Sequence, residues 1–144
     1  APQSQITKES LQTAAARTVD GLNQATGKVG ITGFCYGGGV SNAAAVAIPE
    51  LACAVPCYGR QPPLKEVDKI QAPLLLHYAG LDERINAGRS AYEAAMKTAN
   101  VRFESFVYEG KQHAFHNDTN TARYDKAAAE LAWARTLALF SKTL

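Results

Sequence analysis

The pattern Gly33-x-Cys35-x-Gly37 constrains the fold of this chain more than any other feature of its sequence. An apolar, β-leaning run, residues 29–34, leads into it, and a run of mostly small residues, 36–47, follows it. This arrangement is typical of a nucleophile elbow, a sharp turn from a strand into a helix, here with a thiol in place of the usual hydroxyl. Because such a turn strains its central residue and brings the neighbouring chain close, we expect both flanking positions to require glycine. We also expect the helix N-terminus to favour the thiolate form of Cys35.

All three cysteines can also be interpreted as buried core residues. A cysteine between glycines can also be a buried residue that packs as a small hydrophobe, and the pentapeptide alone does not separate the two interpretations for Cys35. Cys53 and Cys57 lie in one apolar run, 51–58, and lack the C-x-x-C spacing of a metal or redox pair. We therefore expect both in the core, with no metal site and no disulfide framework. Free thiols fit a reducing compartment and predict a cytoplasmic protein, or an exported form if a leader has been removed.

Size and composition favour a single folded domain over residues 1–144. Hydrophobic residues make up 47% of the chain and charged residues 19%, which is ordinary for a folded soluble protein. The net charge is +2 and the basic residues are scattered, so no nucleic-acid groove is predicted. No apolar run reaches the length of about 18 residues that a membrane span requires.

Strand and helix patterns alternate along the chain. Strands are predicted at residues 29–34, 51–58, 73–79 and 101–108, and helices at residues 4–23, 36–48, 87–99 and 125–144. Pro56, inside the second predicted strand, indicates a bulge or an end. In the last helix an apolar face is predicted at helical spacing by Trp133, Leu137, Phe140 and Leu144. This alternation predicts an α/β fold with a mostly parallel sheet and helices on both faces.

Three chemically apt residues each follow a different predicted strand, namely Cys35, Asp82 and His113. Because functional groups gather at the carboxyl ends of parallel strands, we expect these side chains to meet. Their chain order of nucleophile, acid and histidine is that of the α/β-hydrolases. His113 would take the thiol proton and later return a proton to the leaving group, while Asp82 would hold the imidazole tautomer. The backbone N–H of Tyr36 is placed to donate to a developing oxyanion.

Each of these residues has a plainer alternative. Asp82 could cap the helix that follows it, although Asn86 is better placed for that cap. His113 could be a surface residue of a loop, and His116 is its nearest rival. His77 lies within a predicted strand and is expected to be a core histidine. Because three correct residue types follow three strands, the triad remains the favoured interpretation.

The chain resembles the dienelactone hydrolase family, the cysteine-nucleophile branch of the α/β-hydrolase fold. The resemblance covers nearly the whole chain and rests on residues 33–38, 74–82 and 108–115. It implies a three-layer α/β-hydrolase-like fold and a small-molecule substrate with a lactone or ester bond. It further implies a thioester acyl-enzyme on Cys35, with no metal and no organic cofactor.

Two departures from the family pattern matter. In the family an arginine a few residues after the histidine helps to hold the substrate carboxylate, whereas residues 114–117 here read Ala-Phe-His-Asn. The family also has further strands before the elbow, and this chain has one predicted helix there. It looks like the C-terminal part of the fold, with about four strands present and the N-terminal strands missing. The strand 29–34 would then be an apolar edge strand, and we expect it to pair in a homo-oligomer or with a missing N-terminal polypeptide.

Three functions fit these observations. The first is hydrolysis of esters or lactones by Cys35, His113 and Asp82. The second is a non-catalytic fragment or interaction domain that retains the triad but needs a missing N-terminal half for activity. The third is a thiol redox protein, which ranks last because Cys35 has no resolving C-x-x-C partner. Ester turnover separates the first function from the second.

Overall fold

The computed structural model describes residues 26–144, and the helix expected over residues 4–23 lies outside them. The described elements are β1 (Gly30–Phe34), α2 (Tyr36–Ala47), β2 (Cys53–Cys57), the 3₁₀ helix η1 (Leu64–Lys69), β3 (Leu74–Ala79), α3 (Glu83–Asn86), α4 (Arg89–Thr98), β4 (Phe103–Tyr108) and α5 (Lys126–Thr143). The four predicted strands and the three predicted helices within this range are confirmed, with shifts of one or two residues at their ends. The short helix α3, between β3 and α4, was not predicted.

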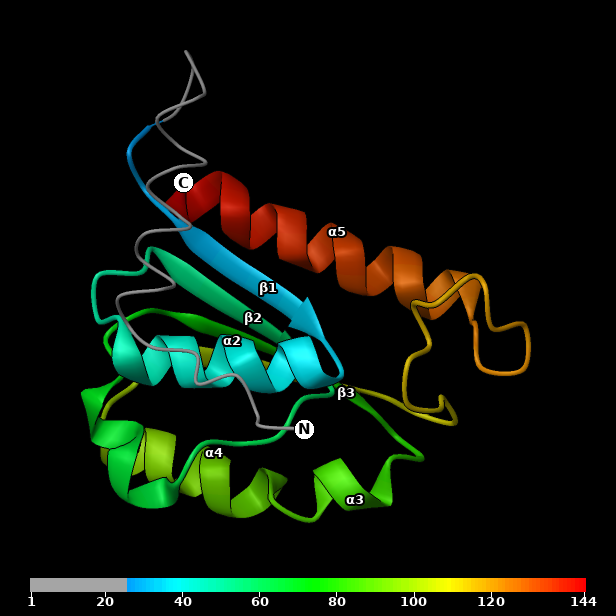
Figure 1. Cartoon of the computed structure of the whole chain (residues 1–144), viewed down its shortest axis with the longest axis horizontal. Coiled ribbons are helices and arrows are strands. Elements are labelled where there is room, and N and C mark those ends of the chain that lie inside the picture. Colours follow the sequence, from blue (N-terminus) through cyan, green and yellow to red (C-terminus); the bar gives the residue numbers. More distant parts are fainter. Residues whose placement is uncertain (1–25) are drawn as a thin grey trace, which may run out of the picture.

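The four strands form one parallel sheet in the order β1-β2-β3-β4 (Figure 1). Pro56 makes no bulge, because β2 and β3 keep the same offset at Ala54–Leu74 and at Cys57–His77, on either side of it. The strand ends one residue after the proline. Among the described residues β1 has a neighbouring strand on one side only, so the strand that leads into Cys35 is an edge strand, as predicted.

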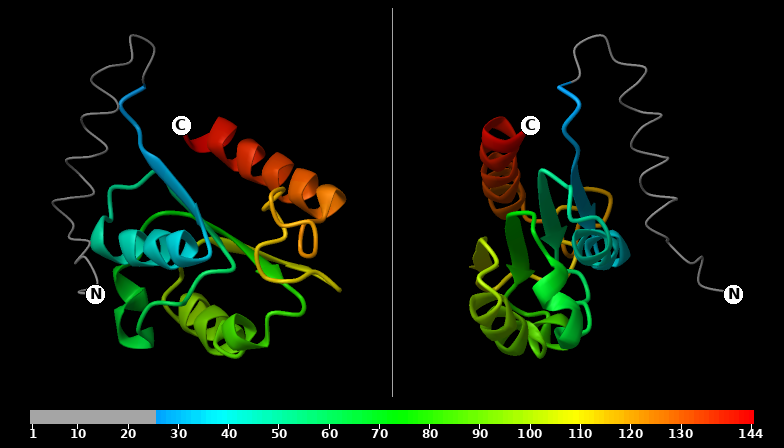
Figure 2. Two further views of the ribbon diagram at one scale, coloured as in Figure 1. Left: turned by 45° about the vertical axis from the view of Figure 1, so that its right-hand side comes forward. Right: turned by 90° about the vertical axis from the view of Figure 1, so that its left-hand side faces the viewer.

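Both faces of the sheet are covered by helices. Successive residues of β3 point to opposite faces, as in any strand. Leu76 and Tyr78 pack in one core cluster with Met96 of α4, whereas Leu75 packs in another with Ala132 of α5. Figures 1 and 2 show α5 on one side of the strands and α2 and α4 on the other. The predicted three-layer arrangement is therefore confirmed.

Helix α5 places mostly small side chains against the sheet, which corrects part of the predicted apolar face. Its buried residues are Ala128, Ala132 and Thr136. Trp133 and Leu137 of the predicted face are 44% and 45% exposed. Small side chains allow the helix to approach the strands closely, so Trp133 and Leu137 remain outside, whereas Phe140 is partly buried and packs against the core cluster that contains Ala132. The exposed apolar side chains of the predicted face form a stripe, which we call the α5 stripe: Trp133, Leu137 and Leu144.

Cys53 and Cys57 are buried within β2, and neither forms a disulfide. Their prediction as core residues is confirmed. Within residues 26–144, no helix is long and apolar enough to cross a membrane.

Candidate active site

The chain turns sharply at Cys35, between the end of β1 and the start of α2. Cys35 has φ 57° and ψ −117°, a backbone conformation that residues with a side chain rarely adopt. Its N–H donates to the carbonyl of Cys57 at 3.1 Å, which ties the turn to β2. The strained turn from strand to helix that the glycine spacing predicts is therefore present in the structure.

Neighbouring atoms exclude a side chain at only one of the two flanking glycines. A Cβ atom on Gly33 would lie 2.2 Å from the carbonyl oxygen of Gly37, so no side chain fits there. A Cβ on Gly37 would meet nothing within 4 Å, so the expectation that this position requires glycine is wrong. A second close approach joins Gly38 to Gly59, where a Cβ on Gly59 would lie 2.1 Å from the carbonyl carbon of Gly38. Gly59 closely follows β2, and its place just after a predicted strand was the available signal for this contact.

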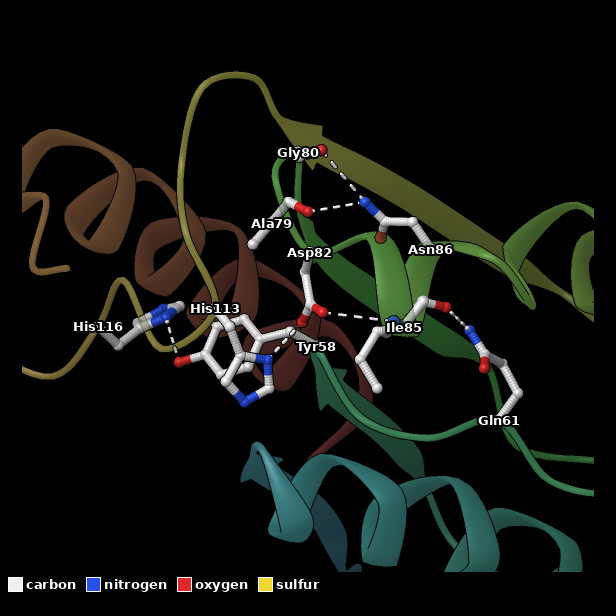
Figure 3. A network of polar contacts seen from close by, with 9 residues as sticks. All are labelled: Tyr58, Gln61, Ala79, Gly80, Asp82, Ile85, Asn86, His113 and His116. Carbon is white, nitrogen blue, oxygen red and sulfur yellow. Dashed lines mark hydrogen bonds and ion pairs between the residues drawn. The ribbon is translucent and has the colours of Figure 1, made fainter.

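Asp82 caps a helix and contacts His113 at the same time. One carboxylate oxygen, Oδ1, accepts from the N–H of Ile85 at 3.3 Å and caps α3. The other, Oδ2, contacts Nδ1 of His113 (Figure 3). Asn86 does not make the cap that we expected, because its amide donates instead to the carbonyl of Ala79 at 2.8 Å. The two interpretations of Asp82 are therefore compatible, since a carboxylate has an oxygen for each contact.

The ring nitrogen of His113 that does not contact Asp82 is Nε2. Because Nδ1 contacts Asp82, Nε2 is the nitrogen that would transfer a proton if His113 acts as a base. In Figure 3 this nitrogen points toward the ribbon of α2, whose N-terminus follows Cys35. His113 and Cys35 line the same cleft, which has a volume of about 1530 Å³. The structure thus brings the three predicted residues to one end of the sheet.

The rival histidines are engaged elsewhere. His77 is completely buried in β3, where Nδ1 lies 3.0 Å from the hydroxyl of Tyr108 and Nε2 lies 3.1 Å from that of Thr136. Burial lowers the pKa of His77 to about 3, so it is neutral at pH 7. Its prediction as a core histidine is confirmed. Nδ1 of His116 contacts the hydroxyl of Tyr58, and the structure shows no carboxylate partner for His116 among the described residues.

The charge environment of Cys35 differs from the one expected from the helix alone. Burial raises the pKa of its thiol, and the negative charge of Asp82 adds to this effect. Arg123 and Arg84 oppose the shift but do not reverse it. We expected the helix N-terminus to favour the thiolate, but the pKa of the Cys35 thiol is nevertheless raised, because burial outweighs the neighbouring positive charge. The thiol is neutral at pH 7 and needs a base before it can act as a nucleophile.

The cleft has both apolar and basic walls. Small residues of α2, including Ala43 and Ala47, form one wall, and Pro63 and Leu64 form part of another. The side chain of Arg60 also lines the cleft. Such a cleft suits a small, partly apolar ligand. In residues 26–144, no group of three or more His, Cys, Asp or Glu side chains could hold a metal ion.

Tyr36 is the first residue of α2. The first N–H groups of a helix have no carbonyl partner within the helix, so they are available to a ligand. This is the position from which its backbone N–H was expected to act as an oxyanion donor.

The fold and the candidate site are those of the α/β-hydrolase class. The sheet is parallel, one strand turns into a helix at a strained cysteine, and an acid and a histidine follow later strands. The crystal structure of a protein named “Putative Dienelactone Hydrolase”, from Klebsiella pneumoniae, matches this fold with a TM-score of 0.84 and 26% identity, over 96% of this chain and 63% of that one. The chain belongs to the dienelactone hydrolase family, which matches residues 3–144.

Two curated relatives show the extent of the similarity. The protein named “Putative carboxymethylenebutenolidase” from Saccharolobus solfataricus is 40% identical over 114 residues, which are 78% of this chain and 44% of that protein. “Protein usf” from Aquifex pyrophilus is 37% identical over 121 residues, 81% of this chain and 52% of that protein. The chain thus spans about half the length of the curated relatives it matches.

Proposed function

We propose that this chain carries the catalytic triad of a carboxylic ester or lactone hydrolase, with Cys35 as nucleophile, His113 as general base and acid, and Asp82 as the residue that orients His113. One observation carries the proposal most directly. Asp82 contacts Nδ1 of His113, and His113 lines the same cleft as the strained Cys35. Membership of the dienelactone hydrolase family supports the same chemistry.

The reaction follows from this geometry in two halves. Nε2 of His113 takes the proton from Sγ of Cys35, and the thiolate attacks the carbonyl carbon of the ester. The backbone N–H of Tyr36 donates to the resulting oxyanion. When the tetrahedral intermediate collapses, the C–O bond to the alcohol breaks and His113 returns its proton to the leaving oxygen. Water, deprotonated by His113, then attacks the thioester and releases the acid, and the sulfur regains its proton.

The neutral state of Cys35 fits this sequence of steps. Burial and the charge of Asp82 both raise the pKa of the thiol, which keeps its proton until a base removes it. Transfer to His113 creates an imidazolium beside the carboxylate of Asp82, which stabilises it. We further propose a cytoplasmic location, since free thiols persist in a reducing compartment. The substrate that we propose is a small ester or lactone, as the name carboxymethylenebutenolidase of the relatives suggests.

The second candidate function is a non-catalytic fragment or interaction domain. It is favoured by the open edge of β1, which leaves a strand without a partner on one side among the described residues. It is also favoured by the length of the relatives, of which this chain covers about half. In that case activity requires a partner, either a second copy of the chain or a separate polypeptide that supplies further strands.

Hydrolysis of p-nitrophenyl acetate tests the proposal. We expect turnover, and after an acid quench an acetyl group on the peptide that contains Cys35. The Cys35→Ala variant should lose both signals, and Cys53→Ala, which removes a buried thiol of β2, should keep both. A folded protein that shows neither turnover nor an acetylated Cys35 would favour the second candidate function, and acetylation of Cys53 or Cys57 would contradict the assignment of the nucleophile.

A further inference from the structure

The contact with Asp82 does not by itself hold the ring of His113 in one orientation. A single contact at Nδ1 allows the imidazole to tilt about that contact, and such a tilt moves Nε2 away from its proton-transfer position. A second contact on the ring is needed to prevent it. Tyr58 supplies this contact, since its ring centroid lies 5.0 Å from that of His113 with an angle of 59° between the planes.

Tyr58 is itself held firmly. It is 2% exposed, and its N–H donates to the carbonyl of His77 at 2.7 Å. An edge-to-face contact with Phe115, at a centroid distance of 5.3 Å, fixes its ring. Its backbone has φ 35°, in the left-handed region that favours glycine. Strain of this kind persists where the surroundings determine the conformation, and it is concentrated at functional sites.

The hydroxyl of Tyr58 connects it to the loop that carries His113. It lies 3.1 Å from Nδ1 of His116, three residues after His113 (Figure 3). Burial lowers the pKa of His116 to about 4, so this imidazole is neutral at pH 7, and burial also raises the pKa of the Tyr58 phenol. The phenol therefore keeps its proton and can donate it to Nδ1 of His116. One loop thus contacts the same tyrosine through both of its histidines.

The other contacts of His116 suit an anchor and not a base. Its ring stacks on Phe115 at a centroid distance of 4.5 Å and lies 4.8 Å from the ring of Phe34. With Nδ1 on Tyr58 and two aromatic rings against it, the imidazole has little freedom to exchange protons with a substrate. These contacts explain why two histidines in one loop have different roles.

We propose that Tyr58, anchored by His116, is a positioning residue that sets the orientation of the catalytic His113. This inference rests on the proposed function, because it assigns His113 as the base. It adds a role for two residues that do not belong to the triad. The consequence is that the Tyr58 hydroxyl, which bonds to His116, controls how well His113 is aligned.

The variant Tyr58→Phe removes only the hydroxyl and tests the anchor. We expect kcat for p-nitrophenyl acetate to fall about fivefold to twentyfold with KM unchanged, since alignment affects the proton-transfer step and not binding. His116→Gln should have a similar effect. The double variant should be no worse than either single variant, because both remove the same hydrogen bond.

The matched control is Tyr108→Phe. Tyr108 also places its hydroxyl 3.0 Å from Nδ1 of a buried histidine, His77, but it does not line the cleft. We expect this variant to lower thermal stability and to leave kcat unchanged. A fall in kcat equal to that of Tyr58→Phe would show a general effect of removing a buried hydroxyl and would overturn the inference.

A second measurement does not depend on ester turnover. In imidazole ¹H–¹⁵N spectra the Nδ1 proton of His113 should give one narrow signal in the wild type and a broadened or shifted signal in Tyr58→Phe. If the chain lacks esterase activity, this spectrum still tests the positioning, so failure of the proposed function and failure of the inference are distinguished. An unchanged His113 signal in both Tyr58→Phe and His116→Gln would overturn the inference.

Discussion

Strands β1 and β3 each lead to a residue of the candidate site, but they have very different surroundings. All six residues of β3 are buried, and the strand has a neighbour on both sides. The residues of β1 are half-buried or exposed, and the strand has a neighbour on one side among the described residues. The proposed acid, Asp82, therefore follows a strand with neighbours on both sides, whereas the proposed nucleophile, Cys35, follows an open edge.

A hydrogen-bonded chain reinforces β3 from the side of α5. The hydroxyl of Thr136 donates to the carbonyl of Ala132 at 2.9 Å, so it accepts from Nε2 of His77. The other nitrogen of His77 then accepts from the hydroxyl of Tyr108, which in turn accepts from Arg135 at 3.0 Å. In β1, by contrast, the hydroxyl of Thr32 donates to a carbonyl of the neighbouring β2. Cys35, which follows β1, is therefore held by fewer neighbouring elements than Asp82, which follows β3. Whether the two residues nevertheless act together can be tested.

The largest expected effect is on catalysis. Cys35→Ala and His113→Ala should each lower kcat/KM for p-nitrophenyl acetate by about 10⁴-fold, because the members of a triad act as a unit. Asp82→Asn should cost somewhat less, since Asp82 does not touch the substrate. Circular dichroism serves as the control that each variant is folded. Near-normal turnover in His113→Ala would overturn the assignment of His113, and with it the proposal that Cys35 after β1 and Asp82 after β3 act together through this histidine.

The next effect concerns the thiols. Cys35 is partly exposed, whereas Cys53 and Cys57 are buried, and burial raises the pKa of Cys57 to about 12. Iodoacetamide at neutral pH should therefore label Cys35 at least about 100-fold faster than the other two. Mass mapping of the labelled peptides over time measures the three rates. Early labelling of Cys53 or Cys57 would mean that β2 opens more readily than the turn at Cys35, and it would remove the contrast between edge and core.

A smaller effect is expected from the pH dependence of stability. The pKa of His77 is about 3 in the folded protein and about 6.5 when unfolded, so unfolded chains take up the proton first. Its contribution to stability is fully present above about pH 6.5 and is lost as the pH falls toward 3. Between about pH 6.5 and about pH 5 the loss should be about 1.5 kcal/mol.

Urea unfolding of the wild type and of His77→Gln over this pH range isolates the contribution of His77. The pKa of His116 is also lowered, to about 4, and adds a slope of the same sign in both proteins. Tyr108, whose pKa is raised, stays neutral across the range, and Arg135 donates to its hydroxyl. The slope should therefore be shallower in the variant by about 1.5 kcal/mol over the interval. Equal slopes would show that His77 takes up a proton as readily in the folded protein as in the unfolded chain, and that β3 is less firmly closed than its burial indicates.

The smallest effect, about a doubling of mass, is expected in light scattering. The open edge of β1 and the α5 stripe favour pairing with a second copy, since unpaired strands and apolar patches seek partners. Leu137→Glu places a charge in the α5 stripe and should shift the chain toward the monomer. Leu131→Glu is the matched control, because Leu131 is 47% exposed on another side of α5. A well-folded wild-type monomer at micromolar concentration would contradict this prediction.

The sequence by itself determined the succession of strands and helices and the three residues that follow the strands. Apolar runs, periodicity and glycine spacing act over a few neighbouring residues, so they are readable without a structure. This is why the turn at Cys35, the parallel sheet and the core position of His77 were predicted. The edge position of β1 was expected from the resemblance to the family, which has further strands before the elbow.

Only the tertiary structure decided which contacts these residues make. The two contacts of Asp82, the choice of His113 over His116, and the neutral thiol of Cys35 depend on side chains that are distant in the sequence. Likewise, α5 buries Ala128, Ala132 and Thr136 while Trp133 and Leu137 stay exposed, because the distance between helix and sheet limits what fits there. Burial and charge arise from the packing of several elements at once, and no single segment of the sequence contains that information.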